Sequence, residues 1–407
     1  MKGQLSDNSY QTEPLLGLAD RYERFLVVAF QPFSDRNLER FGARWLLNAG
    51  KKVDLIDVSC LVWDQPTKLL ESKSDFIVLR PRSWKEFERF AEDHADSSLA
   101  ILCGVIPQLG PPLFRVLDSL SLPVLYFESG RLPRPCNYGK RLTNILQLMR
   151  TDPGKVFEKG LRLAKSMRNN SIDIDYLVMG GKATELDPPK WVKKAKRLIP
   201  AHSYDYVVWN SSRQYKSDTP YVVFLDQAYP DHTDPINLKL NTPFRRDVYY
   251  PEMVKFLTHA SRLYSMPVIV ALHPRATLNG DNPYGTIEAI VGHTASLVKG
   301  ASLVIAHDTA AISFAVLGRK RLLLVKLPEM AEWTAEGIID RLAESLGAPL
   351  VFLEDHNLPP IEEMIVNEHK YDGYEKMYLR HPSCNGIPVW DRVFDSGPDG
   401  ISRSVSI

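Results

Sequence analysis

Short β-rich apolar runs that alternate with helical patterns limit most strongly what this chain can fold into. Each run is followed by turn residues or by a candidate helix. Such alternation is typical of a parallel sheet covered by helices on both faces, so we expect an α/β protein. The runs of the first series are residues 25–30, 53–58, 75–80, 99–105 and 123–128.

A second series of the same kind follows the amphipathic, basic stretch at residues 154–170. Helices are expected between its runs, including one at residues 188–198 (PPKWVKKAKRL). Two successive doubly wound units predict a cleft between two domains, where such folds bind their ligands. The runs of the second series are residues 175–181, 204–209, 221–227, 267–274, 301–308, 321–326 and 349–355.

The chain has 407 residues, which is about two to three times the usual length of one domain. We therefore expect a Rossmann-like domain at residues 1–152 and a second one at residues 171–358. A connecting helix at residues 153–170 is expected to join them. Residues 359–407 are expected to form helices and a tail that pack back on the first domain.

The charge and the cysteines exclude several classes of protein. Fifty Lys and Arg residues against 49 Asp and Glu residues lack the basic excess of a nucleic-acid-binding domain. The four cysteines are far apart and form neither a disulfide framework nor a zinc-binding spacing. We expect a reducing compartment, no structural metal and no cofactor. These cysteines are Cys60, Cys103, Cys136 and Cys384.

The N-terminal residues are polar, and the longest apolar runs are far shorter than a membrane span. We therefore expect a cytoplasmic protein. The basic stretch at residues 190–197 leaves two alternatives, which are contact with anionic lipid and a solvated helix face.

Several common catalytic motifs are absent from the sequence. It contains no GxxxxGK[ST] and no GxGxxG between a strand and a helix, so P-loop NTPases and the usual NAD-binding fingerprint are unsupported. It also lacks GxSxG and HExxH, which removes the simplest hydrolase and metalloprotease interpretations.

Polar clusters follow three apolar runs of the second series, and ligands of open α/β sheets gather at such strand ends. Ordinary turn and helix-cap chemistry is the alternative interpretation of each cluster. The clusters are Asp226 with Asp231, His232 and Asp234; His273 with Pro274 and Arg275; and His307 with Asp308, Thr309 and Ser313.

An anionic ligand would explain two of these clusters together. His273 and Arg275 can meet a phosphate or a carboxylate through hydrogen bonds. A helix that starts near Asp308 would present backbone N–H groups to the same anion, with Thr309 and Ser313 on one face. The pair Gly180–Gly181 marks either a tight turn or a close approach of the backbone to a ligand.

Taken together, the strand that ends in LD with HTD in its loop, the HPR turn, and the strand that leads through HDT into AAISFAVLGRKRLLLV resemble GT-B glycosyltransferases. More narrowly, they are similar to bacterial enzymes that use CMP-activated acidic sugars, above all the retaining β-Kdo transferases of lipopolysaccharide O-antigen and capsule assembly. The resemblance covers residues 175–330. The RKHP and QTS signatures of the capsular Kdo transferases are absent.

The resemblance implies metal-independent transfer of Kdo from CMP-β-Kdo to a sugar hydroxyl of a growing surface polysaccharide, through a covalent adduct on an aspartate. Asp234 is the expected nucleophile, Asp226 is expected to organise the loop, and Asp231 is a further candidate. His232 and His307 are candidates for proton transfer, because the unperturbed pKa of histidine is near neutrality. His273, Arg275, Asp308, Thr309, Ser313, Gly180 and Gly181 would bind the CMP donor.

In the first half, the resemblance assigns the acceptor side to residues after the first and fifth runs, for which solvated loops are the alternative. The partners implied are the nucleotide sugar, the glycan acceptor and other assembly modules at the cytoplasmic face of the inner membrane. Two other functions stay open: an inverting, sialyltransferase-like enzyme with an aspartate base, and a non-catalytic binding module. The acceptor-side residues are Gln31, Ser34, Glu128, Arg131 and Arg134.

Overall fold

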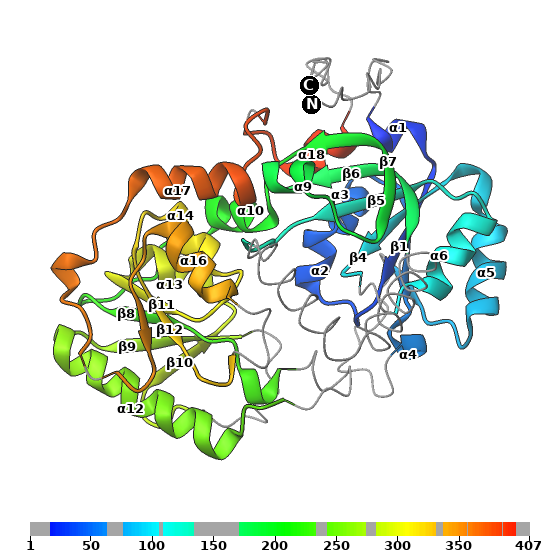
Figure 1. Ribbon diagram of the computed structural model, residues 1–407. Coiled ribbons are helices and arrows are strands. Elements are labelled where there is room, and N and C mark those ends of the chain that lie inside the picture. Colours follow the sequence, from blue (N-terminus) through cyan, green and yellow to red (C-terminus); the bar gives the residue numbers. More distant parts are fainter. Residues whose placement is uncertain are drawn as a thin grey trace, which may run out of the picture.

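The computed structural model describes residues 17–62, 76–105, 109–133, 171–232, 242–273, 282–330, 337–355, 357–384 and 386–395. Within these residues the chain forms two units, each built on a parallel β-sheet with helices around it (Figure 1). This confirms the expected α/β class with two Rossmann-like units. Asp234, Arg275, Arg134, Cys136 and the expected connecting helix at 153–170 lie outside the described residues.

The first sheet has the strand order β3-β2-β1-β4-β5-β6-β7 among the described residues. The chain order reverses between β1 and β4, and such a switch point is where ligands of α/β sheets bind. The strands are β1 (Arg24–Ala29), β2 (Lys52–Asp57), β3 (Ile77–Leu79), β4 (Ser98–Cys103), β5 (Val124–Glu128), β6 (Ile172–Met179) and β7 (Val192–Pro200).

The second sheet has the order β10-β9-β8-β11-β12-β13 among the described residues, with its switch point between β8 and β11. All of its pairings are parallel, so the carboxyl ends of its strands meet at one edge. The strands are β8 (Val222–Leu225), β9 (Val268–Leu272), β10 (Glu288–Val291), β11 (Leu303–Ala306), β12 (Arg321–Lys326) and β13 (Leu350–Phe352).

Helices surround both sheets (Figure 1). Those of the first unit are α1 (Leu18–Arg21), α2 (Asp35–Arg40), α3 (Ala43–Asn48), α4 (Ser59–Val62), α5 (Trp84–Glu92), η1 (Ala95–Ser97), α6 (Pro111–Ser119) and α9 (Lys182–Leu186). Later helices are α10 (Tyr204–Ser211), η2 (Tyr229–Asp231), α12 (Arg246–Tyr264), α13 (Thr294–Gly300), α14 (Ile312–Leu317), α16 (Ile338–Leu346), η3 (Ile361–Glu363), α17 (Glu368–Tyr374), η4 (Glu375–Leu379) and α18 (Val389–Phe394).

The expected boundary between the domains, at residue 171, is wrong. Strand β6 pairs with β5 and β7 pairs with β6, so residues 172–200 complete the first sheet. The helix expected at residues 188–198 is mostly the edge strand β7, whose exposed lysines discourage pairing with another chain. The strand expected at residues 204–209 is the helix α10, because the side chain of Ser203 caps the amide of Tyr206.

The last helices of the chain pack against both units. Helix α18 packs on the first unit, where Phe394 lies against Trp45 with 5.3 Å between ring centroids and against Phe25 with 5.7 Å. This confirms that a C-terminal helix packs back on the first domain. Helix α17 instead packs on the second unit, beside α14 and α16 (Figure 1).

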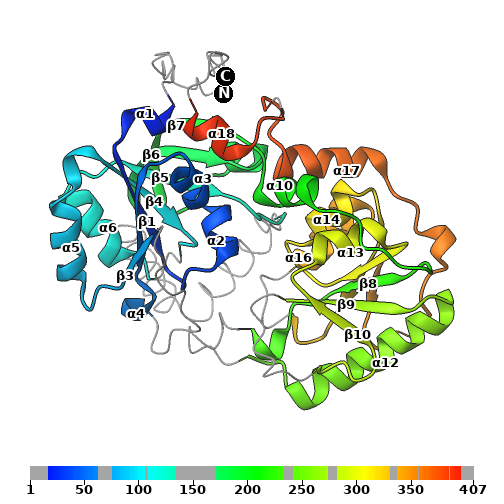
Figure 2. The same ribbon diagram turned by 180° about the vertical axis from the view of Figure 1, so that it is seen from behind.

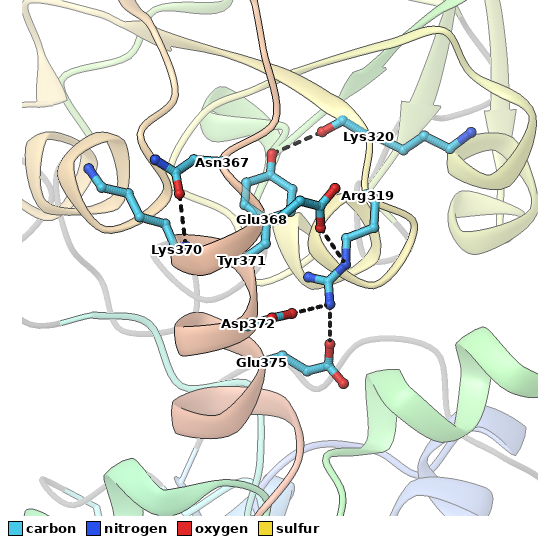
Figure 3. A network of polar contacts seen from close by, with 8 residues as sticks. All are labelled: Arg319, Lys320, Asn367, Glu368, Lys370, Tyr371, Asp372 and Glu375. Atoms are coloured by element: carbon cyan, nitrogen blue, oxygen red, sulfur yellow. Dashed lines mark hydrogen bonds and ion pairs between the residues drawn. The ribbon is translucent and has the colours of Figure 1, made fainter.

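A network around Arg319 attaches α17 to the second unit (Figure 3). The guanidinium forms ion pairs with Glu368 (Nε to Oε2, 3.3 Å), with Glu375 (Nη2 to Oε2, 3.1 Å) and with Asp372. The hydroxyl of Tyr371 donates to the carbonyl oxygen of Lys320 at 2.9 Å. One arginine thereby meets three carboxylates of the C-terminal segment.

Gly181 lies where the backbone of η4 approaches the first unit. A Cβ atom at Gly181 would lie 2.4 Å from the carbonyl oxygen of Met377, and one at Gly180 would lie 2.9 Å from the carbonyl oxygen of Glu128. Protein backbone therefore occupies the space into which a side chain at either glycine would extend. These contacts favour close packing within the chain, and the donor-binding role of Gly180 and Gly181 stays a prediction.

We expect Gly181→Ala to lower the free energy of unfolding by about 1–3 kcal/mol, because the added methyl group forces the backbone of η4 away. Urea or thermal denaturation measures the change. Gly373→Ala in α17 is the matched control, because a Cβ atom there meets nothing within 4 Å. A Gly181→Ala protein as stable as the control would contradict the packing described above.

Candidate functional site

Polar residues after β8, β9 and β11 meet at the carboxyl edge of the second sheet. These strands are neighbours in the order β9-β8-β11, so the residues that follow them are brought together by the sheet itself. Asp226 follows β8, His273 follows β9, and Asp308 follows β11 beyond His307. The side-chain amide of Gln227 joins two of these loops by donating to the carbonyl oxygen of Asp308 at 3.1 Å.

Asp226 connects the loops from beneath. Its Oδ1 accepts hydrogen bonds from the amide of Ala228 at 2.7 Å and from the hydroxyl of Tyr284 at 2.8 Å. Its Oδ2 is buried and has no hydrogen-bond partner among the described residues. Burial raises the pKa of this carboxyl to about 6, although Ala228, Tyr284 and the amide of His273 act in the opposite direction. These contacts agree with the loop-organising role expected for Asp226.

Asp231 is held by cationic and hydroxyl donors at the end of η2. Nη1 of Arg246 lies 2.7 Å from both of its carboxylate oxygens, and the hydroxyl of Tyr250 donates to Oδ2 at 2.6 Å. A carboxylate with so many donors is a weaker nucleophile, because each of these hydrogen bonds stabilises its negative charge. The contacts of Asp231 therefore favour a positioning role.

His232 and His273 lie side by side, with ring centroids 4.6 Å apart. Both rings are partly exposed, and they come from the loops after β8 and β9. Imidazole rings in such a place can donate to phosphate or carboxylate oxygens and can transfer protons. The structure thus brings together two of the predicted site residues that are 41 positions apart in the numbering of the sequence.

His307 is a structural residue, and the expectation that it transfers a proton is wrong. Its ring is fully buried, Nδ1 lies 2.7 Å from the carbonyl oxygen of Val325, and Nε2 lies 3.3 Å from the hydroxyl of Tyr249. Burial lowers its pKa to about 4, so the ring stays neutral near pH 7. A ring with both nitrogens engaged inside the core cannot reach an acceptor hydroxyl.

The residues around α14 also have protein partners. Ser313 is 1% exposed and its hydroxyl donates to Asp205 of α10 at 2.8 Å, so the expectation that Ser313 holds a phosphate is wrong. The hydroxyl of Tyr229 donates to the carboxylate of Asp308, and Oγ1 of Thr309 accepts from the amide of Ala311 at 3.2 Å. Thr309 thus shows the turn chemistry that was the alternative interpretation, whereas the carboxylate of Asp308 is engaged by a tyrosine that is distant in the sequence.

The acceptor-side residues of the first unit have structural contacts as well. Arg131 donates to the carbonyl oxygen of Ala183 at 3.2 Å and forms an ion pair with Asp187, so its guanidinium is already engaged. Ser34 caps α2 by accepting from the amide of Asn37 at 3.3 Å. Gln31 and Glu128 follow β1 and end β5, which places both at the carboxyl edge of the first sheet. An acceptor role stays a prediction for these two.

Two features of the site were missed by the sequence interpretation. The first is a set of buried tyrosines beneath the loops that follow β8, β9 and β11. The only feature of the sequence that could have indicated them is the aromatic content of residues 229–284. The second is Arg40 at the end of α2, which the sequence presents simply as an arginine in a candidate helix. The tyrosines are Tyr229, Tyr249, Tyr250 and Tyr284.

The described residues show neither a metal-binding cluster nor a membrane-spanning helix. No group of three or more His, Cys, Asp or Glu side chains is arranged there as a metal site requires. No helix in the same residues has the length and apolar character needed to cross a bilayer. Cys60, Cys103 and Cys384 are free thiols.

No protein-family model matches this chain, and no curated relative was found. Solved structures do match. A variant of the wall teichoic acid polymerase TagF soaked with CDPG has a TM-score of 0.51 at 10% identity, over 91% of this chain and 86% of that one. The chain has the GT-B fold of glycosyltransferases.

Two other solved structures have lower scores. The UDP-GlcNAc 2-epimerase of Methanocaldococcus jannaschii, in complex with UDP-GlcNAc and UDP, has a TM-score of 0.45 at 13% identity, over 91% of this chain and 98% of that one. MurG of Acinetobacter baumannii has a TM-score of 0.39 at 11% identity, over 86% of this chain and 90% of that one.

Proposed function

We propose that this protein is a glycosyltransferase that transfers Kdo from CMP-β-Kdo to a hydroxyl of a growing bacterial surface polysaccharide. The observation that carries the proposal is the meeting of the loops after β8, β9 and β11 at the switch point of the second sheet. Open α/β sheets bind their ligands at such a switch point. The sugar itself is proposed from the resemblance of residues 175–330 to CMP-sugar enzymes.

In the proposed reaction, His232 and His273 donate hydrogen bonds to the anionic oxygens of the donor, together with Arg275. The carboxylate of Asp234 attacks the anomeric carbon and CMP leaves with the electrons of the broken bond. The acceptor hydroxyl then attacks the same carbon, Asp234 is released, and His232 takes the hydroxyl proton. Two displacements retain the configuration, and the steps are proposed to need no metal.

Asp226 supports this reaction without touching the sugar. Asp226 accepts hydrogen bonds from Ala228 and Tyr284, and the amide of His273 lies close enough to lower its pKa. These interactions hold the loops that carry His232 and His273 in place. Precise positioning of such groups contributes strongly to catalysis, because the reacting atoms must meet in one geometry.

A nucleotide panel tests the donor class first. CMP is expected to raise the melting temperature selectively over UDP, GDP and ADP, since a ligand at 100 times its dissociation constant stabilises by about 2.7 kcal/mol. Selectivity for UDP would overturn the donor class. Binding of CMP without turnover of CMP-Kdo would instead indicate a non-catalytic module.

Mass spectrometry of the protein after incubation with CMP-Kdo tests the mechanism. A retaining enzyme with an aspartate nucleophile is expected to gain the mass of one sugar residue. An inverting enzyme, in which an aspartate acts only as a base, transfers the sugar without this adduct. Transfer without a detectable adduct in rapidly quenched samples would therefore favour the inverting alternative.

A further inference from the structure

Arg40 ends α2, on the side of the first unit that faces the second unit in both views (Figures 1 and 2). Its Nη2 donates to the carbonyl oxygen of Ser129 at 3.3 Å. Its Nε is buried and has no hydrogen-bond partner among the described residues. The side chain as a whole is only partly buried, so the guanidinium stays within reach of a ligand.

The charge of Arg40 has no carboxylate within 4.0 Å among the described residues, in contrast to the charges of Arg319 and Arg80. Arg319 forms ion pairs with three carboxylates, and Nε of Arg80 lies 3.4 Å from Oδ2 of Asp57. A partly buried cation without a counter-ion is costly, because it loses hydration and gains no ion pair. A bound anion would supply the missing counter-charge and hydrogen-bond acceptor.

Arg40 lies between the switch point of the first sheet, beside β4, and that of the second sheet, beside β11. Burial raises the pKa of Cys103 at the end of β4 and of Tyr204 at the start of α10, and the nearby positive charge of Arg40 opposes both shifts. A Cβ atom at Gly130 would lie 3.7 Å from Nη2 of Arg40 and 3.9 Å from Cβ of Ala310. Arg40 therefore lies close to the turn between β11 and α14 in the second unit.

We propose that Arg40 binds an anionic oxygen group of the substrate, a carboxylate or a phosphate, between the carboxyl edges of the two sheets. This rests on the proposed function only for the identity of the substrate. The planar guanidinium can offer two parallel N–H donors to such a group. Arg131, one of the acceptor-side residues expected from the sequence, is already paired with Asp187.

The first test uses simple anions and does not depend on the proposed function. Thermal melts with increasing phosphate or acetate, against chloride at constant ionic strength, give an apparent Kd for the wild type, Arg40→Gln, Arg40→Lys and Arg89→Gln. Arg89 is an exposed arginine of α5 and serves as the matched control. If the site exists, the wild type and Arg89→Gln are expected to have the same apparent Kd for phosphate, and likewise for acetate.

Loss of a charge-assisted bidentate contact is expected to weaken this binding about tenfold or more in Arg40→Gln. Arg40→Lys keeps the charge without the planar fork, so a smaller loss is expected and this variant answers the question if Arg40→Gln does not fold. The proposal is overturned if the wild type binds neither anion, or if the Arg40 variants bind as well as Arg89→Gln.

The second test separates the two sources of the anion, using CMP and CMP-Kdo as probes. If Arg40 binds the carboxylate of the donor sugar, Arg40→Gln weakens CMP-Kdo about tenfold and leaves CMP unchanged. If Arg40 binds an anionic acceptor, the affinities for CMP and for CMP-Kdo stay unchanged and the KM for the acceptor rises. A wild type that binds phosphate at Arg40 but neither nucleotide would refute the proposed function and leave the anion site standing.

Discussion

Asp234→Asn is expected to lower the rate of sugar transfer by about 10³-fold or more, because an amide cannot attack the anomeric carbon. The protein should still bind CMP, since the phosphate contacts are proposed to come from other side chains. Initial rates with CMP-Kdo and a glycan acceptor measure the loss. Asp247→Asn is the matched control: Asp247 is exposed, pairs with Arg245 of its own turn, and should leave the rate unchanged.

The same variant separates the candidates for the nucleophile. Asp231 already accepts from Arg246 and Tyr250, and Asp226 is buried beneath the loops, so neither is arranged to replace Asp234. Full activity in Asp234→Asn would show that the nucleophile was assigned to the wrong residue. Lost activity together with no sugar adduct in the wild type would instead make Asp234 the base of an inverting enzyme.

The fold class was predictable from local patterns, and so was the edge of the sheet at which the three polar clusters meet. Apolar runs with helices between them determine a parallel sheet, and polar residues after β8, β9 and β11 must then meet at one edge. His232 and His273 both lie at this edge, with their rings side by side. This is why short motifs far apart in the chain predicted one constellation.

The individual roles were less predictable, because they depend on partners that are distant in the chain. Ser313 has the sequence context of a ligand-binding helix start, yet its partner is Asp205, 108 positions earlier. Gly181 fits a ligand loop equally well until the backbone of Met377 is placed against it. A sequence shows which residue types stand at a strand end, and only the packed structure shows which of them are already engaged.

The domain boundary failed for a related reason. Residues 172–179 have the pattern of a strand in either sheet, and no local feature states whether that strand pairs with β5 or starts a new sheet. The structure adds β6 and β7 to the first sheet before the chain crosses to the second unit. Helix α10 then contributes Asp205, which joins the units through Ser313.

Asp226→Asn is expected to change how stability depends on pH. The pKa of Asp226 is raised from 3.8 to about 6 in the folded protein, so folding favours its protonated form. The favourable contribution of this carboxyl to the free energy of unfolding is fully present below pH 3.8 and is lost as the pH rises through about 6. At pH 7.5 the wild type therefore bears a cost of about 3 kcal/mol that the neutral asparagine avoids.

The free energy of unfolding of Asp226→Asn, relative to the wild type, should accordingly rise by about 2 kcal/mol between pH 4 and pH 7.5, because part of the cost is already present at pH 4. Urea denaturation at both pH values measures it. Asp218→Asn, an exposed change before β8, is the control and should show no such rise. A difference between Asp226→Asn and the wild type that does not vary with pH would contradict the burial of an ionised carboxylate at this position.

Asp226→Ala should behave in the opposite way. It leaves the amide of Ala228 and the hydroxyl of Tyr284 without their acceptor, at about 1–3 kcal/mol for each unsatisfied group. If the asparagine variant is more stable at pH 7.5 yet transfers sugar more slowly, the carboxylate is retained at the expense of stability. A charge kept in this way beneath His232 and His273 would belong to the chemistry of the site rather than to the folding of the sheet.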